Sequence, residues 1–96
     1  MRTRYLVTYD VCHPTRLRKV FEICKSFGDH LQLSVFRCDL SKADLIRMKS
    51  ALKDVLHMRE DQVLFVDVGP PGGRAGEAFE AMGLPLEPPS TGAKIV

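Results

Sequence analysis

One carboxylate near the start of the chain, Asp10, has the surroundings of a group that could do chemistry. It follows the aromatic and β-branched run 5–9 and precedes a basic segment. An acid at the end of a buried strand can cap the turn or helix that follows, or it can ligate a metal ion. The two alternatives imply different proteins, and spacing alone leaves both open.

A magnesium site at Asp10 would need more than this one side chain. Mg²⁺ is usually held by one or two protein carboxylates, with water or phosphate oxygens in the remaining positions. If a twofold axis brought two copies of Asp10 together, the pair could bind one ion, which would activate a water molecule and stabilise charge on a phosphodiester. Under this hypothesis, dimerisation creates the site.

Basic side chains follow Asp10 closely enough to meet a phosphate near it. Arg16 and Arg18 belong to the next segment, for which a solvated helix face is the plainer interpretation. Arg37 stands between two apolar residues of a strand-like segment, where it either pairs with an acid across the sheet or contacts phosphate. The pattern leaves these alternatives open.

Other polar and aromatic groups have structural explanations. Asp67 is flanked by valines and is expected to be solvent-facing or hydrogen-bonded. The three histidines lack the spacing of a metal cluster, and Tyr9 and Phe36 are expected in the core rather than stacked on bases. No Gly-Lys-Ser or Gly-Lys-Thr follows the late glycines, which excludes a phosphate loop there.

Composition predicts one small domain with an uneven charge distribution. The chain has 96 residues, of which 45% are hydrophobic, enough for a single core. Residues 1–59 carry a net charge of +6 and residues 60–96 a net charge of −4, so one surface could attract phosphate. The three cysteines suggest neither a disulfide framework nor a zinc site, and no stretch resembles a signal peptide or membrane span. We therefore expect a soluble, cytoplasmic protein.

The first half of the chain predicts a strand, a helix and a strand pair. Residues 4–11 have the pattern of a central strand. Pro14 and Thr15 open a helix, with Thr15 as a candidate cap, and Gly28 ends it as a left-handed residue. The alternation over residues 30–40 slips once, which indicates two short strands joined by a bend, or one strand with a bulge.

A second helix and a further strand follow. Ser41 and Asp44 predict a capping box, and residues 62–68 form a nearly continuous apolar strand. The polar face of the second helix carries three lysines in register, Lys42, Lys49 and Lys53.

This order of elements predicts an α+β, ferredoxin-like split βαβ fold, with an antiparallel four-stranded sheet and both helices on one face. Residues 1–70 would form the core domain. Residues 71–96 would form a C-terminal extension, with a short helix over 74–82 and a terminal strand at 93–96 that pairs across a dimer. The helix-free, apolar face of the sheet argues for an isologous homodimer.

Three stretches in combination resemble one protein family: Tyr5 to Val11, Arg16 to Val20, and Gln32 to Leu40. They are similar to the CRISPR-associated family that forms the small subunit of the spacer-acquisition complex, known as endoribonucleases or double-stranded DNA endonucleases. The resemblance covers about residues 4–96. The Tyr-Asp pair and the Ser-Val-Phe motif are common separately and specific together.

The resemblance implies a homodimer in which Asp10 of each protomer faces its mate and binds Mg²⁺ or Mn²⁺. It also implies a role in antiviral defence in which the dimer binds duplex DNA and bridges two copies of the CRISPR-associated integrase, with Arg16, Arg18 and Arg37 on phosphates. Metal-dependent hydrolysis of RNA or DNA goes with the family, although bridging does not require it. Relatives often have another acid soon after the aspartate, whereas residues 12–14 here are Cys-His-Pro, which argues against a fuller acidic site.

Two other hypotheses belong to different classes of protein. A ferredoxin-like module could bind single-stranded RNA on its sheet without catalysis, although the aromatic-rich RNP strand is absent from this sequence. A metal-free regulatory or oligomerisation domain would bind neither divalent ions nor nucleic acid.

Overall fold

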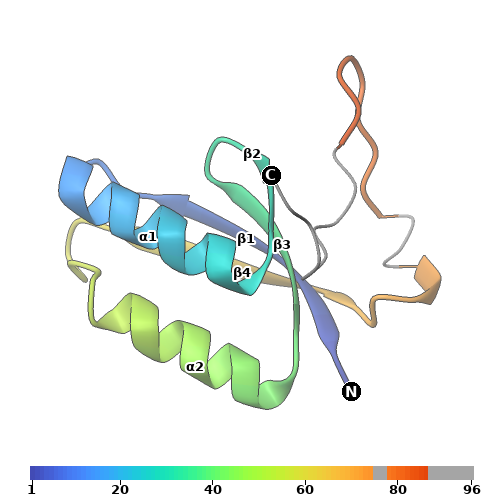
Figure 1. Cartoon of the computed structure of the whole chain (residues 1–96), viewed down its shortest axis with the longest axis horizontal. Helices are drawn as coiled ribbons and strands as arrows, with labels where there is room; N and C mark the ends of the chain where they lie inside the picture. The colour runs from blue at the N-terminus through green and yellow to red at the C-terminus, as the bar shows by residue number, and fades with distance from the viewer. Residues whose placement is uncertain (75–77, 87–96) are drawn as a thin grey trace.

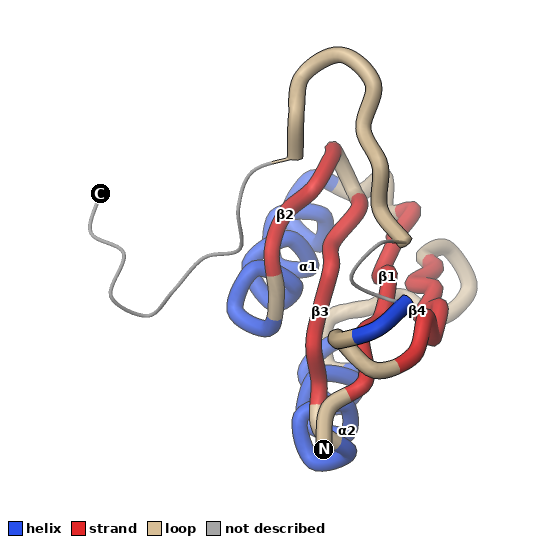
Figure 2. The backbone as a smooth tube through the Cα atoms, turned by 90° about the vertical axis from the view of Figure 1, so that its right-hand side faces the viewer, coloured by secondary structure: helices blue, strands red, loops and turns tan. Residues whose placement is uncertain are grey.

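The computed structural model describes residues 1–74 and 78–86, and these form a two-layer α+β fold (Figure 1). A sheet makes one layer, and two α-helices make the other by packing on one face of the sheet (Figure 2). In chain order the elements are β1 (Thr3–Asp10), α1 (Pro14–Phe27), β2 (Asp29–Gln32), β3 (Val35–Leu40), α2 (Lys42–Lys53) and β4 (Gln62–Gly69).

The sheet has the strand order β2-β3-β1-β4, and all three neighbouring pairs are antiparallel. β1 is therefore a central strand, hydrogen-bonded to β3 on one side and β4 on the other. Both connections that contain a helix place that helix on the same face. The predicted ferredoxin-like fold, with its helix-free sheet face, is confirmed.

The hydrophobic core lies between the sheet and the two helices. Phe36 of β3 is fully buried, and its ring centroid lies 6.2 Å from that of Tyr9 and 5.5 Å from that of Phe21. Tyr9 and Phe36 therefore face the helices, as the sequence predicted. The other buried apolar residues of this core are Val7, Val11, Val20, Cys24, Cys38, Leu40, Met48 and Leu52.

Helix α1 begins differently from the prediction. Its N-cap is His13, whose Nδ1 accepts a hydrogen bond from the Arg16 backbone N–H at 3.5 Å, and Pro14 opens the helix. Thr15, the predicted cap, is already inside the helix. The reason is that Pro14 fixes a helical φ at the first position of the helix, which puts the cap at His13, two residues before Thr15.

The end of α1 shows why a glycine stands there. Gly28 has φ −166° and ψ −164°, an extended conformation, so the predicted left-handed residue is wrong. What requires glycine is close packing: a Cβ at Gly28 would lie 2.4 Å from the Arg37 carbonyl oxygen and 2.4 Å from Cys38 Sγ. Gly28 thus lets the end of α1 approach β3.

The slip in the alternation of residues 30–40 corresponds to the first predicted alternative, two short strands joined by a bend. A tight turn at Leu33 and Ser34 separates β2 from β3, and the register also shifts between His30 and Gln32. Leu33 has a positive φ of 30°, which leucine rarely adopts, and its side chain is 85% exposed.

Helix α2 begins as the sequence predicts. Ser41 is the N-cap, its hydroxyl accepts a hydrogen bond from the Asp44 N–H at 3.1 Å, and Asp44 accepts one from the Ser41 N–H at 3.3 Å. The reciprocal pair is a capping box. Met48 and Leu52 then place the apolar face of α2 in the core.

After β4 the chain returns across the helix-free face. Residues 78–82 are not helical, so they do not form the short helix predicted over 74–82, and residues 75–77 lie outside the described residues. Residues 69–83 include two prolines and five glycines, which explain the missing helix because both residue types disfavour helical backbone. The predicted strand at 93–96 also lies outside the described residues, and the division at residue 70 stays a prediction.

Neither helix of the described chain has the length and apolar character that crossing a bilayer requires.

Candidate metal and nucleic-acid site

Asp10 occupies the last position of β1, on the helix-free face of the sheet. It pairs in register with Gln62 of β4, and two residues earlier Thr8 pairs with Leu64. Because side chains alternate along a strand, Asp10 points away from the face that buries Tyr9. Its side chain is exposed and forms no hydrogen bond or ion pair with any residue in the described ranges.

The capping alternative for Asp10 is therefore wrong. The N-cap of α1 is His13, three residues later, and the first backbone bond of the helix runs from the Leu17 N–H to the His13 carbonyl at 2.8 Å. Asp10 stays outside this cap. An exposed carboxylate at the end of a strand, without a partner in the described part of the chain, is available for a ligand.

One protomer does not supply a complete metal centre. Among the residues that the structure describes, no group of three or more His, Cys, Asp or Glu side chains could hold a metal ion. Asp10 offers a single hard oxygen donor of the kind that Mg²⁺ prefers. Among the described residues, Asp10 therefore offers an ion one carboxylate, and a site with two copies of Asp10 would need a second copy of the chain.

The sheet face next to Asp10 is apolar and open. Leu64 and Val66 of β4 are 49% and 44% exposed, and in register they lie opposite Thr8 and Leu6 of β1. Large apolar side chains that are half exposed side by side thus form an apolar patch on this sheet face.

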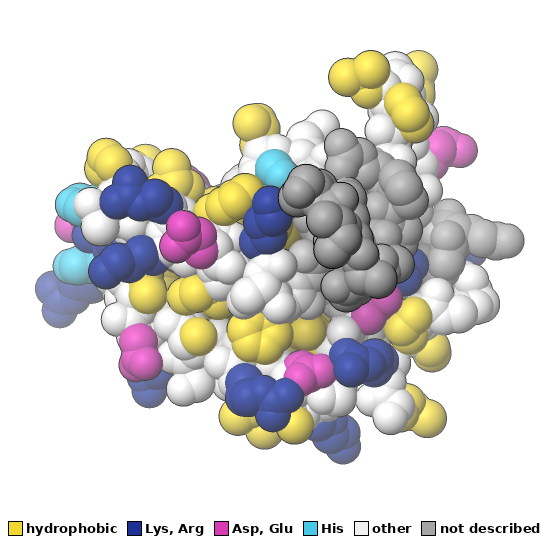
Figure 3. All heavy atoms as spheres, viewed as in Figure 1, with side chains coloured by type: hydrophobic (Ala, Val, Ile, Leu, Met, Phe, Trp, Pro, Cys, Tyr) yellow, Lys and Arg dark blue, Asp and Glu magenta, His cyan; other side chains and the backbone are white. Residues whose placement is uncertain are grey.

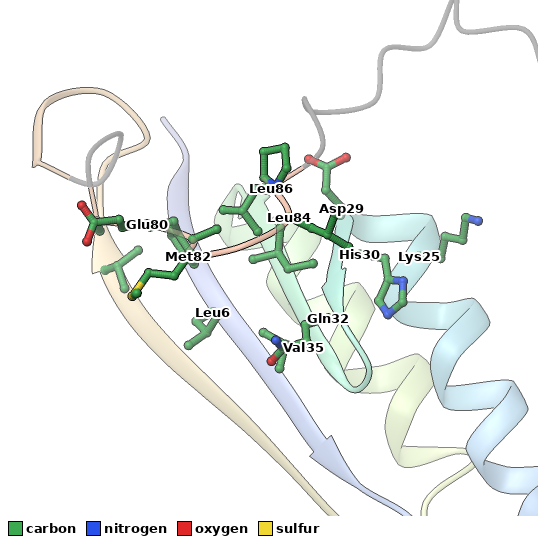
Figure 4. Close-up of a pocket in the computed structure, with 17 residues that line it drawn as sticks. Leu6, Lys25, Asp29, His30, Gln32, Val35, Glu80, Met82, Leu84 and Leu86 are labelled. Atoms are coloured by element: carbon green, nitrogen blue, oxygen red, sulfur yellow. The ribbon is translucent and has the colours of Figure 1, made fainter.

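The β2–β3 part of the same face is covered by residues 78–86 of the chain itself. Figure 4 shows this segment passing above the strands that carry Leu6 and Val35. The covering is loose, because a hollow of about 1210 Å³ lies between the segment and the sheet, and Met82 and Leu84 are 96% and 90% exposed.

Arg16, predicted to contact phosphate, is held in ion pairs. Its Nε lies 2.7 Å from Asp61 Oδ2 and its Nη2 lies 3.0 Å from Glu60 Oε1. The Asp61 side chain is only 1% exposed and also accepts a hydrogen bond from the His57 N–H at 2.8 Å. These bonds hold the pKa of the Asp61 carboxyl below its usual value and raise the pKa of Arg16. Arg16 thus ties the start of α1 to the loop before β4.

Arg37, the second predicted phosphate contact, is buried on the helix-free face. It is 9% exposed, its Nη2 lies 3.9 Å from Asp29 Oδ2 on the neighbouring strand, and its guanidinium lies 5.8 Å from the centre of the Phe79 ring. Asp29 and Arg37 are register partners. Of the two alternatives open in the sequence, pairing with an acid across the sheet is the one that the structure forms.

Arg18 is the predicted arginine that remains accessible. It is exposed on α1 and forms no ion pair with a described residue. Arg16 and Arg37 differ from Arg18 because each has an acidic partner, Asp61 and Asp29 respectively. Neither partner was identified from the sequence. Asp61 is 45 residues from Arg16, so no local pattern could have indicated that pair.

Three comparisons with known proteins agree with this fold. The family model for CRISPR associated protein Cas2 matches residues 1–71. A CRISPR-associated endoribonuclease Cas2 of Geobacter sulfurreducens is 40% identical over 70 residues, which are 73% of this chain and 74% of the relative.

Two solved structures are also similar. The crystal structure of Streptococcus pyogenes Cas2 superposes with a TM-score of 0.73 at 29% identity, covering 83% of this chain and 99% of that chain. A hypothetical protein from Thermus thermophilus superposes with a TM-score of 0.77 at 28% identity, covering 94% of this chain and all of its own. The fold is thus shared with proteins of the ferredoxin-like α+β class. The chain belongs to the Cas2 family of CRISPR-associated proteins.

Proposed function

We propose that this chain is the small subunit of a CRISPR adaptation complex and forms a homodimer that holds Mg²⁺ or Mn²⁺ between two copies of Asp10. The dimer would bind duplex DNA, bridge two copies of the integrase, and hydrolyse phosphodiesters of RNA or DNA. The observation that carries the proposal is the exposed Asp10 carboxylate, which has no partner among the described residues. The names of the relatives, CRISPR-associated endoribonuclease or endonuclease Cas2, support the nuclease activity.

The helix-free face is the surface through which the dimer would form. An isologous interface brings a residue near the twofold axis against its own copy. Leu64 and Val66 would be covered by the second copy, and Asp10, on the same face, would meet its mate. Two carboxylates that approach each other repel, and a divalent cation between them removes this repulsion.

The contribution of the chain to the chemistry is to hold Asp10 in place. Asp10 is still paired with Gln62 of β4, and the preceding Tyr9 N–H donates to the Ser34 carbonyl at 3.1 Å, so the Asp10 backbone is more restrained than a loop position would be. A bound divalent ion would supply a Lewis acid that activates water and stabilises negative charge on the phosphodiester.

The test compares Asp10→Asn with Asp67→Asn. Asp67 is an exposed strand aspartate on β4 whose Oδ1 accepts a hydrogen bond from the Gly69 N–H at 2.8 Å, a bond that asparagine can keep. We expect the unaltered chain and Asp67→Asn to bind Mn²⁺ in calorimetry, with one ion per dimer, and to cleave RNA or duplex DNA only with a divalent ion. Asp10→Asn should lose both properties.

The oligomeric state has to be measured beside these activities. Sedimentation should show that Asp10→Asn remains a dimer, because the apolar part of the interface is intact. Metal-dependent cleavage by a pure Asp10→Asn dimer would contradict the proposal, and so would a monomer that binds Mn²⁺ through Asp10.

A second candidate is an adaptation subunit that binds DNA and the integrase without hydrolysis. It is favoured by the absence of a third ligand near Asp10 among the described residues, because a nuclease site usually offers a metal more donors. Spacer acquisition by an Asp10→Asn variant would support it. The single-stranded RNA module gains nothing from the structure, since Tyr9 and Phe36 are buried against the helices and cannot stack on bases.

A further inference from the structure

The positive charge of this protein is concentrated in its helical layer. Helices α1 and α2 each carry a net charge of +3, whereas the four strands together carry −2. In the space-filling view, Lys and Arg side chains gather over both helices (Figure 3). The excess of positive charge in the first 59 residues therefore occupies the layer opposite the open sheet face.

The two layers also differ in whether their cations are neutralised. The two strand arginines, Arg4 and Arg37, are each paired with an acid, Arg4 with Asp39 at 2.7 Å and Arg37 with Asp29 at 3.9 Å. By contrast, none of the lysines in the described ranges takes part in an ion pair. The unpaired lysines of the described ranges thus lie on the helices.

Three of these lysines, Lys42, Lys49 and Lys53, lie on one stripe of α2, which we call the α2 lysine row. All three are exposed, and Ile46, in the same stripe, is 68% exposed. At 1.5 Å per residue, Lys42 and Lys49 are about 10 Å apart along the axis, and Lys49 and Lys53 about 6 Å apart. Duplex DNA carries one negative charge per about 1.7 Å of its axis, so long lysine side chains at these spacings can each reach a separate phosphate.

The row does not serve the stability of the helix. Lys42 is the first residue of α2, where the helix dipole disfavours a cation. Lys49 and Lys53 are four residues apart, so their like charges repel. The one described contact of the row is Lys49 Nζ above the Phe65 ring, 5.3 Å from its centre, which leaves the ammonium open to solvent.

Exposed acids near the row are few. Among the acids of the two helices and their caps, Asp44 forms ion pairs with Arg2 and Arg47, whereas Glu22 and Asp54 are exposed. A polyanion on this layer therefore meets more cations than anions.

We infer that the α2 lysine row binds the phosphates of duplex DNA, which would lie along the helical layer, with the two sheet faces of the dimer packed away from it. This inference rests on the proposed function. It assigns DNA binding to residues other than Arg16 and Arg37, which are held by acids of the chain itself.

The test removes the row and follows the salt dependence of binding. Each phosphate contact contributes about 0.9 to the slope of log K against log salt concentration for B-DNA. The triple variant Lys42→Gln, Lys49→Gln, Lys53→Gln should therefore lower the magnitude of that slope by about 2.7 per protomer in contact. Fluorescence anisotropy of a labelled blunt duplex, titrated at several NaCl concentrations, measures this slope, and circular dichroism checks the fold.

A second triple variant controls for the loss of net charge. Arg2→Gln, Arg59→Gln, Arg74→Gln removes three exposed cations outside the helices. We expect this variant to change the slope by less than about 0.9, which is the contribution of one phosphate contact. If the lysine variant keeps the slope of the unaltered chain, or if both triple variants lose the same amount, the inference is wrong. Failure of the unaltered chain to bind duplex DNA at low salt would instead contradict the proposed function.

Discussion

Replacement of Gly28 by alanine tests the packing of α1 against β3, the contact that sets how closely the helical layer approaches the sheet. A Cβ at this position would lie 2.4 Å from the Arg37 carbonyl oxygen, 2.4 Å from Cys38 Sγ and 2.9 Å from Cys38 Cα. Two of these three atoms belong to the backbone of β3, which cannot move without disturbing its hydrogen bonds to β1 and β2. The substitution therefore has to shift either the end of α1 or the strand.

The size of the effect follows from two opposing contributions. Overpacking in a well-packed region typically destabilises by about 1–3 kcal/mol, and a clash with backbone belongs at the upper end, near 3 kcal/mol. Alanine also restricts the unfolded chain, which stabilises by about 0.4–1 kcal/mol where the backbone conformation is accessible, as it is for the extended Gly28. The net loss is about 2 kcal/mol, which for a domain of this size lowers the Tm by about 8–16 °C.

Differential scanning calorimetry or thermal circular dichroism would measure this change, with Gly72→Ala as the matched control. Gly72 has no atom within 4 Å of an added Cβ and no positive φ, so its replacement should leave the Tm unchanged or raise it slightly. A Gly28→Ala variant as stable as Gly72→Ala would refute the argument that close packing, rather than a turn, requires glycine at the end of α1.

Two further predictions concern groups whose pKa the fold changes. Burial raises the pKa of Cys24 and of Cys38 to about 12. Iodoacetamide in mild base should therefore alkylate the exposed Cys12 in the native protein, and all three thiols only after denaturation. Equal alkylation rates of the three thiols in the native protein would contradict this. Arg4 donates hydrogen bonds to Asp39 at 2.7 and 2.9 Å and lowers the pKa of Asp39 from its ordinary 3.8. The pair should therefore stabilise the fold fully above pH 3.8, and this stabilisation should be lost as the pH falls through the lowered pKa of Asp39. A double-mutant cycle in urea should give a coupling of about 1 kcal/mol at neutral pH and almost none in strong acid, and a coupling independent of pH would contradict the assignment.

The limits of prediction from the sequence are clearest in the three arginines assigned to phosphate. All three are predicted to contact phosphate, yet of Arg16, Arg18 and Arg37 only Arg18 is both exposed and without an ion pair to a described residue. Their difference depends on acids from other elements, Asp61 and Asp29. Such pairs form only when the sheet register and the helix positions are fixed.

Local patterns determined most of the secondary structure of this protein. The spacing of apolar residues and the Ser41–Asp44 capping box act within one or two turns, so the sequence alone was enough to predict both helices, the strands and their order. Asp10 could likewise be placed at the end of a strand. The segment after residue 70 was predicted less well, because its helical periodicity is weak and its glycines and prolines disfavour a helix.

Only the tertiary structure decided which of these side chains is free. Asp10 has no partner among the described residues because His13 caps α1 and because strand alternation turns Asp10 away from the core. Lys42, Lys49 and Lys53 form no ion pair with a described residue because they lie on the exposed side of α2, away from the face that buries Met48 and Leu52. A sequence specifies the charge of each residue, but whether that charge meets an opposite one inside the molecule depends on contacts between residues far apart in the chain.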